Sequence, residues 1–371
     1  MFQKYNSFYY NKLRKQHNIL VLVGNGFDVS VLKKYNQGRM KGKTTSYKDF
    51  YDYITHHNLV DQSNILYKKM TEDRNSHKDN WSDFENSIKE LFESGESAVS
   101  ELEKCVDEFQ GFFTRFLNDM VDIDFLLKIN EESKKNKFAN QSLAHFLEDI
   151  NSPTFQFPEN TDHYDLFDYV FVNFNYTSIL DNYMCMDKDQ FDPHCYKSID
   201  TNFSFYLNDE FKNKHQTVYS SYVISDIIHP HGVQDVPRSI LFGMDIPNYD
   251  KGKSEEKKLI KSYWAQYDIK YKSYFDDAEL FIIYGMSLGQ SDGWWMDKIF
   301  DAILDRQAEL IIYMFGREKE ENVKNRFIQA CIRHAGATEE DKDNVKERIF
   351  VVTFAKNDTY FLGLEKKDDI K

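Results

Sequence analysis

Short apolar runs recur along the chain and alternate with segments that suit helices. The runs cover residues 19–23, 169–172, 280–284, 310–314 and 349–354. They consist mainly of branched and aromatic residues, which is typical of strands buried on both faces of a sheet. Because most of them precede a helix-compatible segment, the pattern predicts an α/β fold built on a parallel sheet with flanking helices.

The pattern changes between residues 45 and 150. Glycine almost disappears there, and charged segments carry apolar residues at spacings of three and four, as at Phe84 and Ile88. Such spacing predicts amphipathic helices. We therefore expect residues 1–44 and 151–371 to form the α/β core and residues 45–150 to form a large helical insertion.

A less regular region follows the second apolar run. Short strand candidates occur at residues 203–206, 218–228 and 240–242. The charged segment 251–274 is expected to form a helix.

The first apolar run stops abruptly at a Gly-x-Gly turn. The turn and the residues after it are Gly24, Asn25, Gly26, Phe27 and Asp28. In an open parallel sheet, ligands bind beyond the carboxyl ends of the strands. We expect the turn to leave backbone N–H groups free near the next helix, where they can hold a pyrophosphate. The third glycine of the dinucleotide fingerprint is missing, so a turn that needs glycine only for its backbone angles is the alternative.

Three other strand-like segments end in similar polar sets. These sets contain Asn175 and Thr177, then His231 and Gly232, then Gly285, Ser287, Leu288, Gly289, Ser291 and Asp292. Taken singly, each set is compatible with a helix cap or a turn. Because all of them follow predicted strands, together they favour a common cleft at one edge of the sheet.

Several motifs resemble the AbiH family of bacteriophage abortive-infection proteins. They are GNGFD (24–28), TSYKDF (45–50), NWSDFE (80–85), FNYTSILDNY (174–183), HG (231–232) and YGMSLGQSD (284–292), followed by Trp295. The resemblance covers nearly the whole chain and implies a role in defence against phage, with a phage component as a candidate trigger. The chain departs from the family pattern by a lysine-rich insertion, from Lys33 to Lys43, ahead of Thr45.

The succession of strand-end residues also resembles sirtuin-like NAD-binding domains. Gly24 and Gly26, Asn175, His231 with Gly232, and Gly285 with Ser287 and Leu288 follow the order found there. This resemblance implies a Rossmann-like, sirtuin-like sheet with NAD as ligand or substrate. The usual Asn-x-Asp is replaced by Asn175-Tyr176-Thr177, and no cysteine-based zinc module is present, which argues against a protein deacylase.

The resemblance implies hydrolysis of the nicotinamide–ribose bond by an NAD glycohydrolase. Asn175 would orient water or a ribose hydroxyl, His231 would act as general base with an ordinary pKa of about 6.5, and Asp28 would stabilise the cation or bind ribose. The residues expected to bind the nucleotide are Gly24, Asn25, Gly26, Phe27, Thr177, Gly285, Ser287, Leu288 and Asp292. A non-catalytic nucleotide-binding sensor of infection is an alternative.

The charge of the chain bears on whether it binds nucleic acid or membranes. The net charge of −14 opposes non-specific binding to nucleic acid or to anionic membranes. The second alternative is a nuclease or nucleic-acid-targeting toxin. In that case phosphates would be bound by the basic residues Lys33, Lys34, Arg39, Lys41, Lys43 and Lys48.

No apolar run is long enough to span a bilayer, and the N-terminus has no leader pattern, so we expect a cytoplasmic protein. The four cysteines are scattered, and Cys185, His194 and Cys195 fit no zinc spacing, so no metal is predicted. Whether the chain forms a homo-oligomer stays open.

The segment before the helix expected near residue 84 allows two interpretations. Ser82 and Glu85 have the spacing of a capping box, which is a structural role. In the second interpretation, Glu85 is an acidic group that the insertion contributes to the strand-end cleft. The sequence favours the capping box.

Overall fold

The computed structural model describes residues 1–37, 41–79, 81–95, 97–158, 162–191, 203–206, 219–247, 256–355 and 358–367. Within these residues seven strands form one sheet in the order β3-β4-β2-β1-β5-β6-β7. The strands are β1 (Gln16–Val23), β2 (Leu166–Asn173), β3 (Phe203–Phe205), β4 (Tyr219–Ile228), β5 (Leu280–Tyr284), β6 (Glu309–Phe315) and β7 (Ile349–Phe354). The five apolar runs are therefore strands, as the sequence predicts.

The sheet is parallel except at one edge. Every neighbouring pair is parallel apart from β3 and β4, which are antiparallel. The strand order reverses at β1, because β2 and β4 lie on one side of it and β5, β6 and β7 on the other. The chain runs from β1 to β2 on one side and later crosses from β4 to β5 on the other. This change of direction opens a crevice at the carboxyl ends of β1, β2 and β5.

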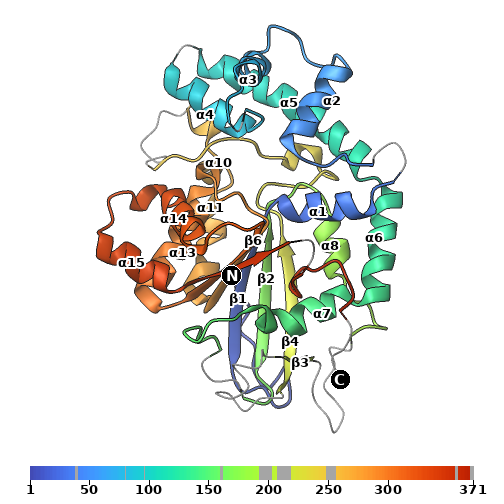
Figure 1. The fold of residues 1–371 in the computed structure, drawn as a ribbon, viewed down its shortest axis with the longest axis vertical. Coiled ribbons are helices and arrows are strands. Elements are labelled where there is room, and N and C mark those ends of the chain that lie inside the picture. Colours follow the sequence, from blue (N-terminus) through green and yellow to red (C-terminus); the bar gives the residue numbers. More distant parts are fainter. Residues whose placement is uncertain are drawn as a thin grey trace.

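The sheet forms the middle of three layers. Ile19 and Val21 enter one apolar core and Leu20 and Leu22 enter the other, because successive side chains of a strand point to opposite faces. One face carries α1 (Gly26–Tyr35), α6 (Ile123–Asn136), α7 (Phe138–His145) and α8 (Ile179–Met184); the other carries α12 (Lys272–Asp277), α13 (Gly293–Arg306), α14 (Glu320–Ala330) and α15 (Glu339–Glu347) (Figure 1). Burial on both sides explains why the strands are apolar throughout.

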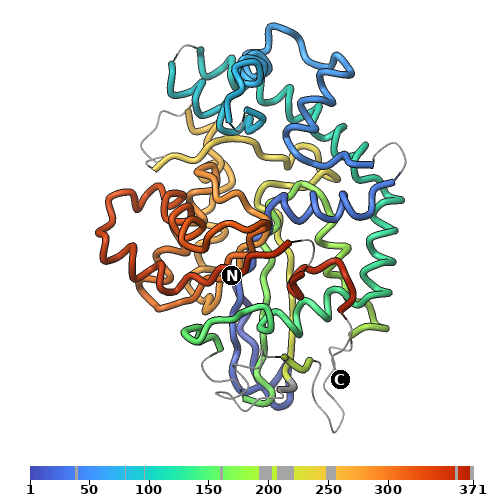
Figure 2. Tube along the Cα trace, in the orientation of Figure 1, coloured from blue at the N-terminus to red at the C-terminus, as the bar shows by residue number. Residues whose placement is uncertain are grey.

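The helical region between β1 and β2 falls into two parts. Helices α2 (Tyr47–His56), α3 (Ile65–Asn75), α4 (Phe84–Ser94) and α5 (Val99–Met120) form a lobe beyond the carboxyl ends of the strands (Figure 1). The chain then runs back beside the sheet, where α6 packs on α8 and α7 packs on β3 (Figure 2). One continuous apolar core joins the lobe to the sheet.

Two expected elements are wrong. Residues 240–242 are not a strand, because Leu241 N–H donates to His231 O at 2.9 Å and the segment wraps the site instead of joining the sheet. The helix expected over 251–274 is broken, in its described part, into η5 (Glu256–Leu259), α10 (Lys261–Trp264), α11 (Tyr267–Lys270) and the start of α12. Gln266 interrupts it with a left-handed φ of 54°.

Two glycine turns lock the ends of β1 and β5 together. Gly24 N–H donates to Tyr284 O and Gly26 N–H donates to Gly285 O, both at 2.8 Å. A Cβ on Gly26 would lie 2.7 Å from Gly285 Cα, and one on Gly285 would lie 2.8 Å from Phe27 N. The glycines are therefore required by the contact between the two turns.

Replacing Gly285 with alanine tests this contact, because Gly95 offers a matched control. Both glycines have left-handed φ, +68° and +66°, but a Cβ on Gly95 would meet nothing within 4 Å. Gly95→Ala should cost about 1 to 2 kcal/mol of unfolding free energy for its φ alone. Gly285→Ala should lose a further 1 to 3 kcal/mol, roughly, through the clash. Urea denaturation measures both; equal losses would show that the turns are not in tight contact.

Candidate functional site

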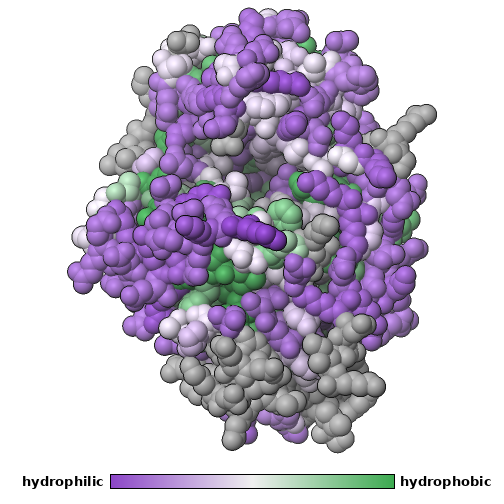
Figure 3. Space-filling model, in the orientation of Figure 1, coloured by the Kyte–Doolittle hydropathy of each residue, from purple (hydrophilic) through white to green (hydrophobic). Residues whose placement is uncertain are grey.

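A cavity of about 670 Å³ lies at the carboxyl ends of β1, β2 and β5. The surface is hollowed between the helical lobe and the sheet layers (Figure 3). The structure brings the four strand-end sets together there: the lining includes Gly24, Asn25, Gly26, Asp28, Asn175, Thr177, His231, Gly285, Ser287, Leu288 and Asp292. Phe27 is the exception, since its ring is buried in the core and packs edge-on against Tyr183 at 5.3 Å.

The backbone of the first glycine turn is largely occupied. The N–H groups of Gly24, Gly26 and Phe27 donate to Tyr284 O, Gly285 O and Gly24 O. The expectation that these three amides are free to hold a pyrophosphate is therefore wrong. The contact between the two turns uses the N–H groups of Gly24 and Gly26, and Phe27 N–H closes the first turn on itself.

Asp28 places a buried carboxyl group in the cavity wall. Its Oδ2 accepts a hydrogen bond from Thr177 Oγ1 at 2.6 Å, and its Oδ1 has no partner in the described part of the chain. Burial raises the pKa of Asp28 to about 7, although the bond from Thr177 opposes the rise. Near neutral pH this group can therefore take up or release a proton.

Asn175 presents an amide without partners. The residue is 3% exposed, and neither its side-chain oxygen nor its nitrogen has a hydrogen-bond partner among the described residues. Its backbone is held firmly, since Asn175 N–H donates to Asn173 Oδ1 at 3.0 Å. A buried amide without partners is costly unless a ligand or water completes its hydrogen bonds.

A buried ion network closes the cavity on the side of the lobe. Lys261 Nζ lies 3.0 Å from Glu85 Oε2 and 3.0 Å from Asp292 Oδ1. Burial alone would lower the pKa of Lys261, but the two carboxylates raise it well above its usual value, so the amine stays charged. At Glu85 the effect of burial is larger than that of Lys261, so the pKa of this carboxyl group is raised. At Asp292 burial also favours the neutral form, but the nearby charges and the hydrogen bond from Lys261 together have the larger effect and the pKa is lowered.

His231 stands beside this network as a neutral imidazole. Burial and the nearby Lys261 charge lower its pKa to about 3. Its Nε2 lies 2.9 Å from the Tyr267 hydroxyl and 3.6 Å from Asp292 Oδ1. The expectation that His231 is a general base with an ordinary pKa is therefore wrong. The pKa of Asp28 lies closer to neutral pH, which favours that carboxyl group for proton transfer.

The insertion contributes directly to the cavity. Thr45 Oγ1 donates to Asn25 Oδ1 at 2.7 Å, which fastens the start of α2 to the glycine turn. The capping box is wrong, because Asp83 caps α4 by accepting a hydrogen bond from Asn86 N–H at 3.1 Å. Glu85 is instead the acidic group that the insertion contributes to the cleft.

Sequence reasoning missed several residues of the site. Lys261 lies in a segment expected to be an ordinary charged helix, and no sequence signal separates it from its exposed neighbours. Arg326, from α14, lines the cavity and keeps a buried Nε without a hydrogen-bond partner in the described chain. His229 Nε2 pairs with Asp181 Oδ1 at 3.0 Å, close enough to Asp28 to affect its pKa.

The basic stretch that would support nucleic-acid binding is partly neutralised. Lys34 pairs with Glu365 at 3.6 Å and Lys43 with Asp49 at 3.9 Å, while Arg39 lies outside the described residues. Lys48 instead lines the cavity.

Two further expectations concern metals and membranes. The described residues contain no group of three or more potential His, Cys, Asp or Glu ligands; His194 and Cys195 lie outside them. Nor does any described helix combine the length and apolar character needed to cross a bilayer.

Comparison with known families gives one result. The family described as Bacteriophage abortive infection AbiH matches residues 20–314, which is most of the chain and includes the second half of β1, the helical lobe, β2 and β5. No curated protein matches the sequence.

Removing the buried amine tests the ion network. Lys261→Met keeps a long side chain but leaves Glu85 and Asp292 without their cation, and should cost about 3 to 5 kcal/mol of unfolding free energy. Lys258 is the control, since it pairs with Glu103 of the same lobe but its side chain is 47% exposed, against 1% for Lys261. Lys258→Met should cost about 1 kcal/mol or less. Similar losses in chemical denaturation would contradict the assigned role of Lys261.

Proposed function

The chain belongs to the bacteriophage abortive infection AbiH family, and we propose that it defends a bacterial cell by binding NAD and hydrolysing its nicotinamide–ribose bond. Loss of NAD would halt metabolism in the infected cell before phage can multiply. The family supports the defence role, and the chemistry of the cavity supports the choice of ligand.

The observation that carries the proposal is the buried amide of Asn175, which has no partner among the described residues and lies in a cavity that also holds Asp28. An amide can donate to one ligand oxygen and accept from one ligand hydroxyl or from water. Asp28 Oδ1 offers a further acceptor. A ribose hydroxyl and an attacking water together supply the groups that these atoms lack.

The strand order supports a Rossmann-like assignment. Without the antiparallel edge strand β3, the parallel strands run β4-β2-β1-β5-β6-β7, which is the 3-2-1-4-5-6 order of dinucleotide-binding sheets. In such sheets the dinucleotide lies across the point where the order reverses, and the cavity lies at that point. Its volume is within the usual range for small-molecule sites, about 300 to 1,000 Å³.

Hydrolysis needs little more than a positioned water and a base. Water attacks C1′ of the nicotinamide ribose, the bond from C1′ to nitrogen breaks, and nicotinamide leaves with the bonding electron pair as a neutral molecule. Asp28 takes the proton lost by water, so the products are ADP-ribose, nicotinamide and a proton. Asn175 orients the water or the ribose, and the transition state has the oxocarbenium character of glycoside hydrolysis.

The two remaining groups serve binding. His231 is neutral and held by Tyr267, so it adds no positive charge where the ribosyl cation develops. Arg326 lines the cavity and pairs with Glu318 through one terminal nitrogen, so its Nε–H group, which has no hydrogen-bond partner among the described residues, is the donor that we assign to the diphosphate.

We expect the purified protein to convert NAD to nicotinamide and ADP-ribose. Asn175→Ala should lower the rate by about 100-fold or more, because the water or ribose loses its positioning group. Asn182 gives the matched control: its amide donates to Ser178 O at 2.8 Å, and the residue lies outside the cavity lining. Asn182→Ala should keep the rate within about twofold.

Chromatography of the products provides the measurement, with thermal unfolding as the check on folding. If the protein binds NAD without turnover, the proposed hydrolysis is wrong and the non-catalytic sensor is the remaining function. A protein that neither binds nor consumes NAD, while Asn175→Ala loses protection against phage, would overturn the NAD assignment.

The pH profile identifies the base. Because the pKa of Asp28 is about 7, kcat/KM should rise about tenfold per pH unit below pH 7 and level off above it, as the carboxylate form becomes dominant. Asp28→Asn should lower kcat by about 100-fold or more and remove the inflection. An inflection that survives in Asp28→Asn would assign the base elsewhere.

A further inference from the structure

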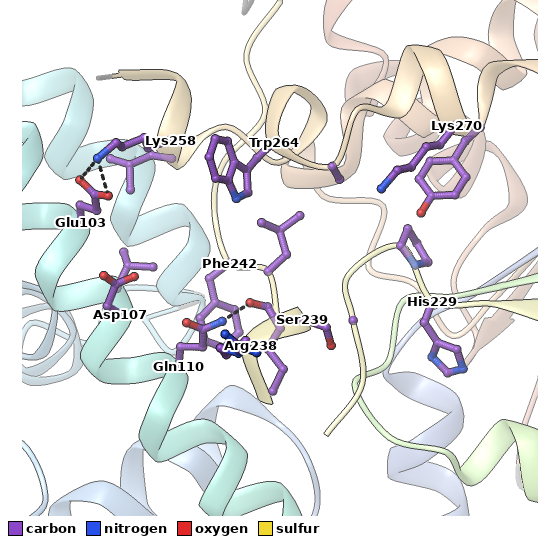
Figure 4. A pocket seen from close by; sticks show the side chains of 18 residues that line it. Glu103, Asp107, Gln110, His229, Arg238, Ser239, Phe242, Lys258, Trp264 and Lys270 are labelled. Atoms are coloured by element: carbon purple, nitrogen blue, oxygen red, sulfur yellow. Dashed lines mark hydrogen bonds and ion pairs between the residues drawn. The ribbon is translucent and has the colours of Figure 1, made fainter. Parts of the chain in front are cut away.

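A second cavity of about 560 Å³ lies between α5 and the segments that follow β4 and η5 (Figure 4). Glu103, Asp107 and Gln110 of α5 lie on one side of it, Lys270 lies across from them, and Trp264 lies at its upper side in Figure 4. His229, Pro230 and Gly232 of the strand-end segment also line it. This cavity is distinct from the first one, and the proposed reaction does not use it.

The second cavity offers a flat apolar surface. Trp264 is 61% exposed, although burying an indole is normally favourable. The exposed ring lines the cavity and lies at one side of it in Figure 4. A planar ring is the group that such a surface recognises best, and base–aromatic stacking is sequence-tolerant.

The charges of the lining favour an anion. Three cations, Arg238, Lys258 and Lys270, stand against two acids, Glu103 and Asp107, in a protein whose net charge is −14. Glu103 is neutralised by Lys258 at 2.8 Å. Within the described part of the chain, Arg238 and Lys270 have no ion-pair partner, and Lys270 Nζ points toward the side where Trp264 lies (Figure 4).

We propose that the second cavity binds a nucleoside phosphate. The base stacks on Trp264, and the phosphate is held by Lys270 with the support of Arg238. Cavity size, ring surface and local positive charge each match a part of such a ligand. Neither a nucleoside nor inorganic phosphate alone satisfies both the ring and the charge.

The two cavities share a wall, so a ligand in one affects the other. His229 and Gly232 line the second cavity while His231 lines the first. Tyr271 of the second cavity packs on Tyr267 at 5.7 Å, and the Tyr267 hydroxyl contacts His231 Nε2 at 2.9 Å. A nucleoside phosphate that shifts this wall would act as an effector of the first cavity, a consequence that rests on the proposed function.

Calorimetric titration of the intact protein with AMP, adenosine and inorganic phosphate tests the binding. AMP should bind at least about tenfold more tightly than either fragment. Trp264→Ala should weaken AMP binding about tenfold or more, and Lys270→Gln about threefold or more. Tyr263 is the aromatic control, being exposed and adjacent but outside the cavity lining. Tyr263→Ala should bind AMP within about twofold of the unmodified protein.

Unchanged AMP binding in Trp264→Ala, or equal weakening in Tyr263→Ala, would overturn the proposal. Asn175→Ala shows which of the two cavities binds AMP. If AMP binds only in the first cavity, Asn175→Ala loses AMP binding and Trp264→Ala retains it. The titration involves no NAD turnover, so its failure is distinct from failure of the proposed hydrolysis. Coupling is measured by repeating it with saturating ADP-ribose, and by reciprocity each ligand must change the affinity of the other by the same factor.

Discussion

The buried amine of Lys261 is the interaction on which the geometry of the cleft depends. It links Glu85 from the helical lobe to Asp292 from the turn after β5, at 3.0 Å each. A charge buried this deeply is tolerated only when its partners are fixed. The pair of contacts therefore ties the lobe to the sheet. Burial lowers the pKa of His231, and the Lys261 charge that these contacts hold nearby lowers it further.

Hydrogen bonds within the protein also satisfy many of the other buried polar groups around the cleft. The two glycine turns use their own amides to hold each other, and the Thr45–Asn25 contact ties the lobe to the first turn. Among the buried polar atoms that lack a hydrogen-bond partner within the described residues, those of Asn175, Asp28, Glu85 and Arg326 belong to the cavity lining, whereas others, such as Asn140 Oδ1, lie elsewhere. Asn175 differs from the other residues in this set because both atoms of its side-chain amide lack a partner there, which makes it the group in the cavity with the most hydrogen-bonding capacity to offer a ligand.

Much of this architecture could be predicted from the sequence, because buried strands and amphipathic helices leave periodic patterns. The five apolar runs, the parallel sheet and the meeting of the strand ends follow from such patterns. The ion network could not be predicted, since Lys261 lies 176 positions from Glu85 in the chain and resembles any surface lysine. The shifts in the pKa values of His231 and Asp28 depend on burial, which no local motif records.

Charge gives the last argument about the ligand. Asp28, Asp83, Glu85 and Asp292 line the first cavity together with the cations Lys48 and Arg326. Glu85 and Asp292 share the amine of Lys261, and Arg326 pairs with Glu318. Within the described residues, the lining charges without an ion-pair partner are Asp28, Asp83 and Lys48, so both signs are still present in the wall. NAD carries a positive nicotinamide ring at one end and a negative diphosphate further along, so it can present each charge to the opposite sign. A cavity with both signs in its wall therefore supports our proposal of a ligand with both signs in its structure. In the proposed reaction, the neutral nicotinamide and the anionic ADP-ribose fit that pattern of charge less well than the intact dinucleotide does.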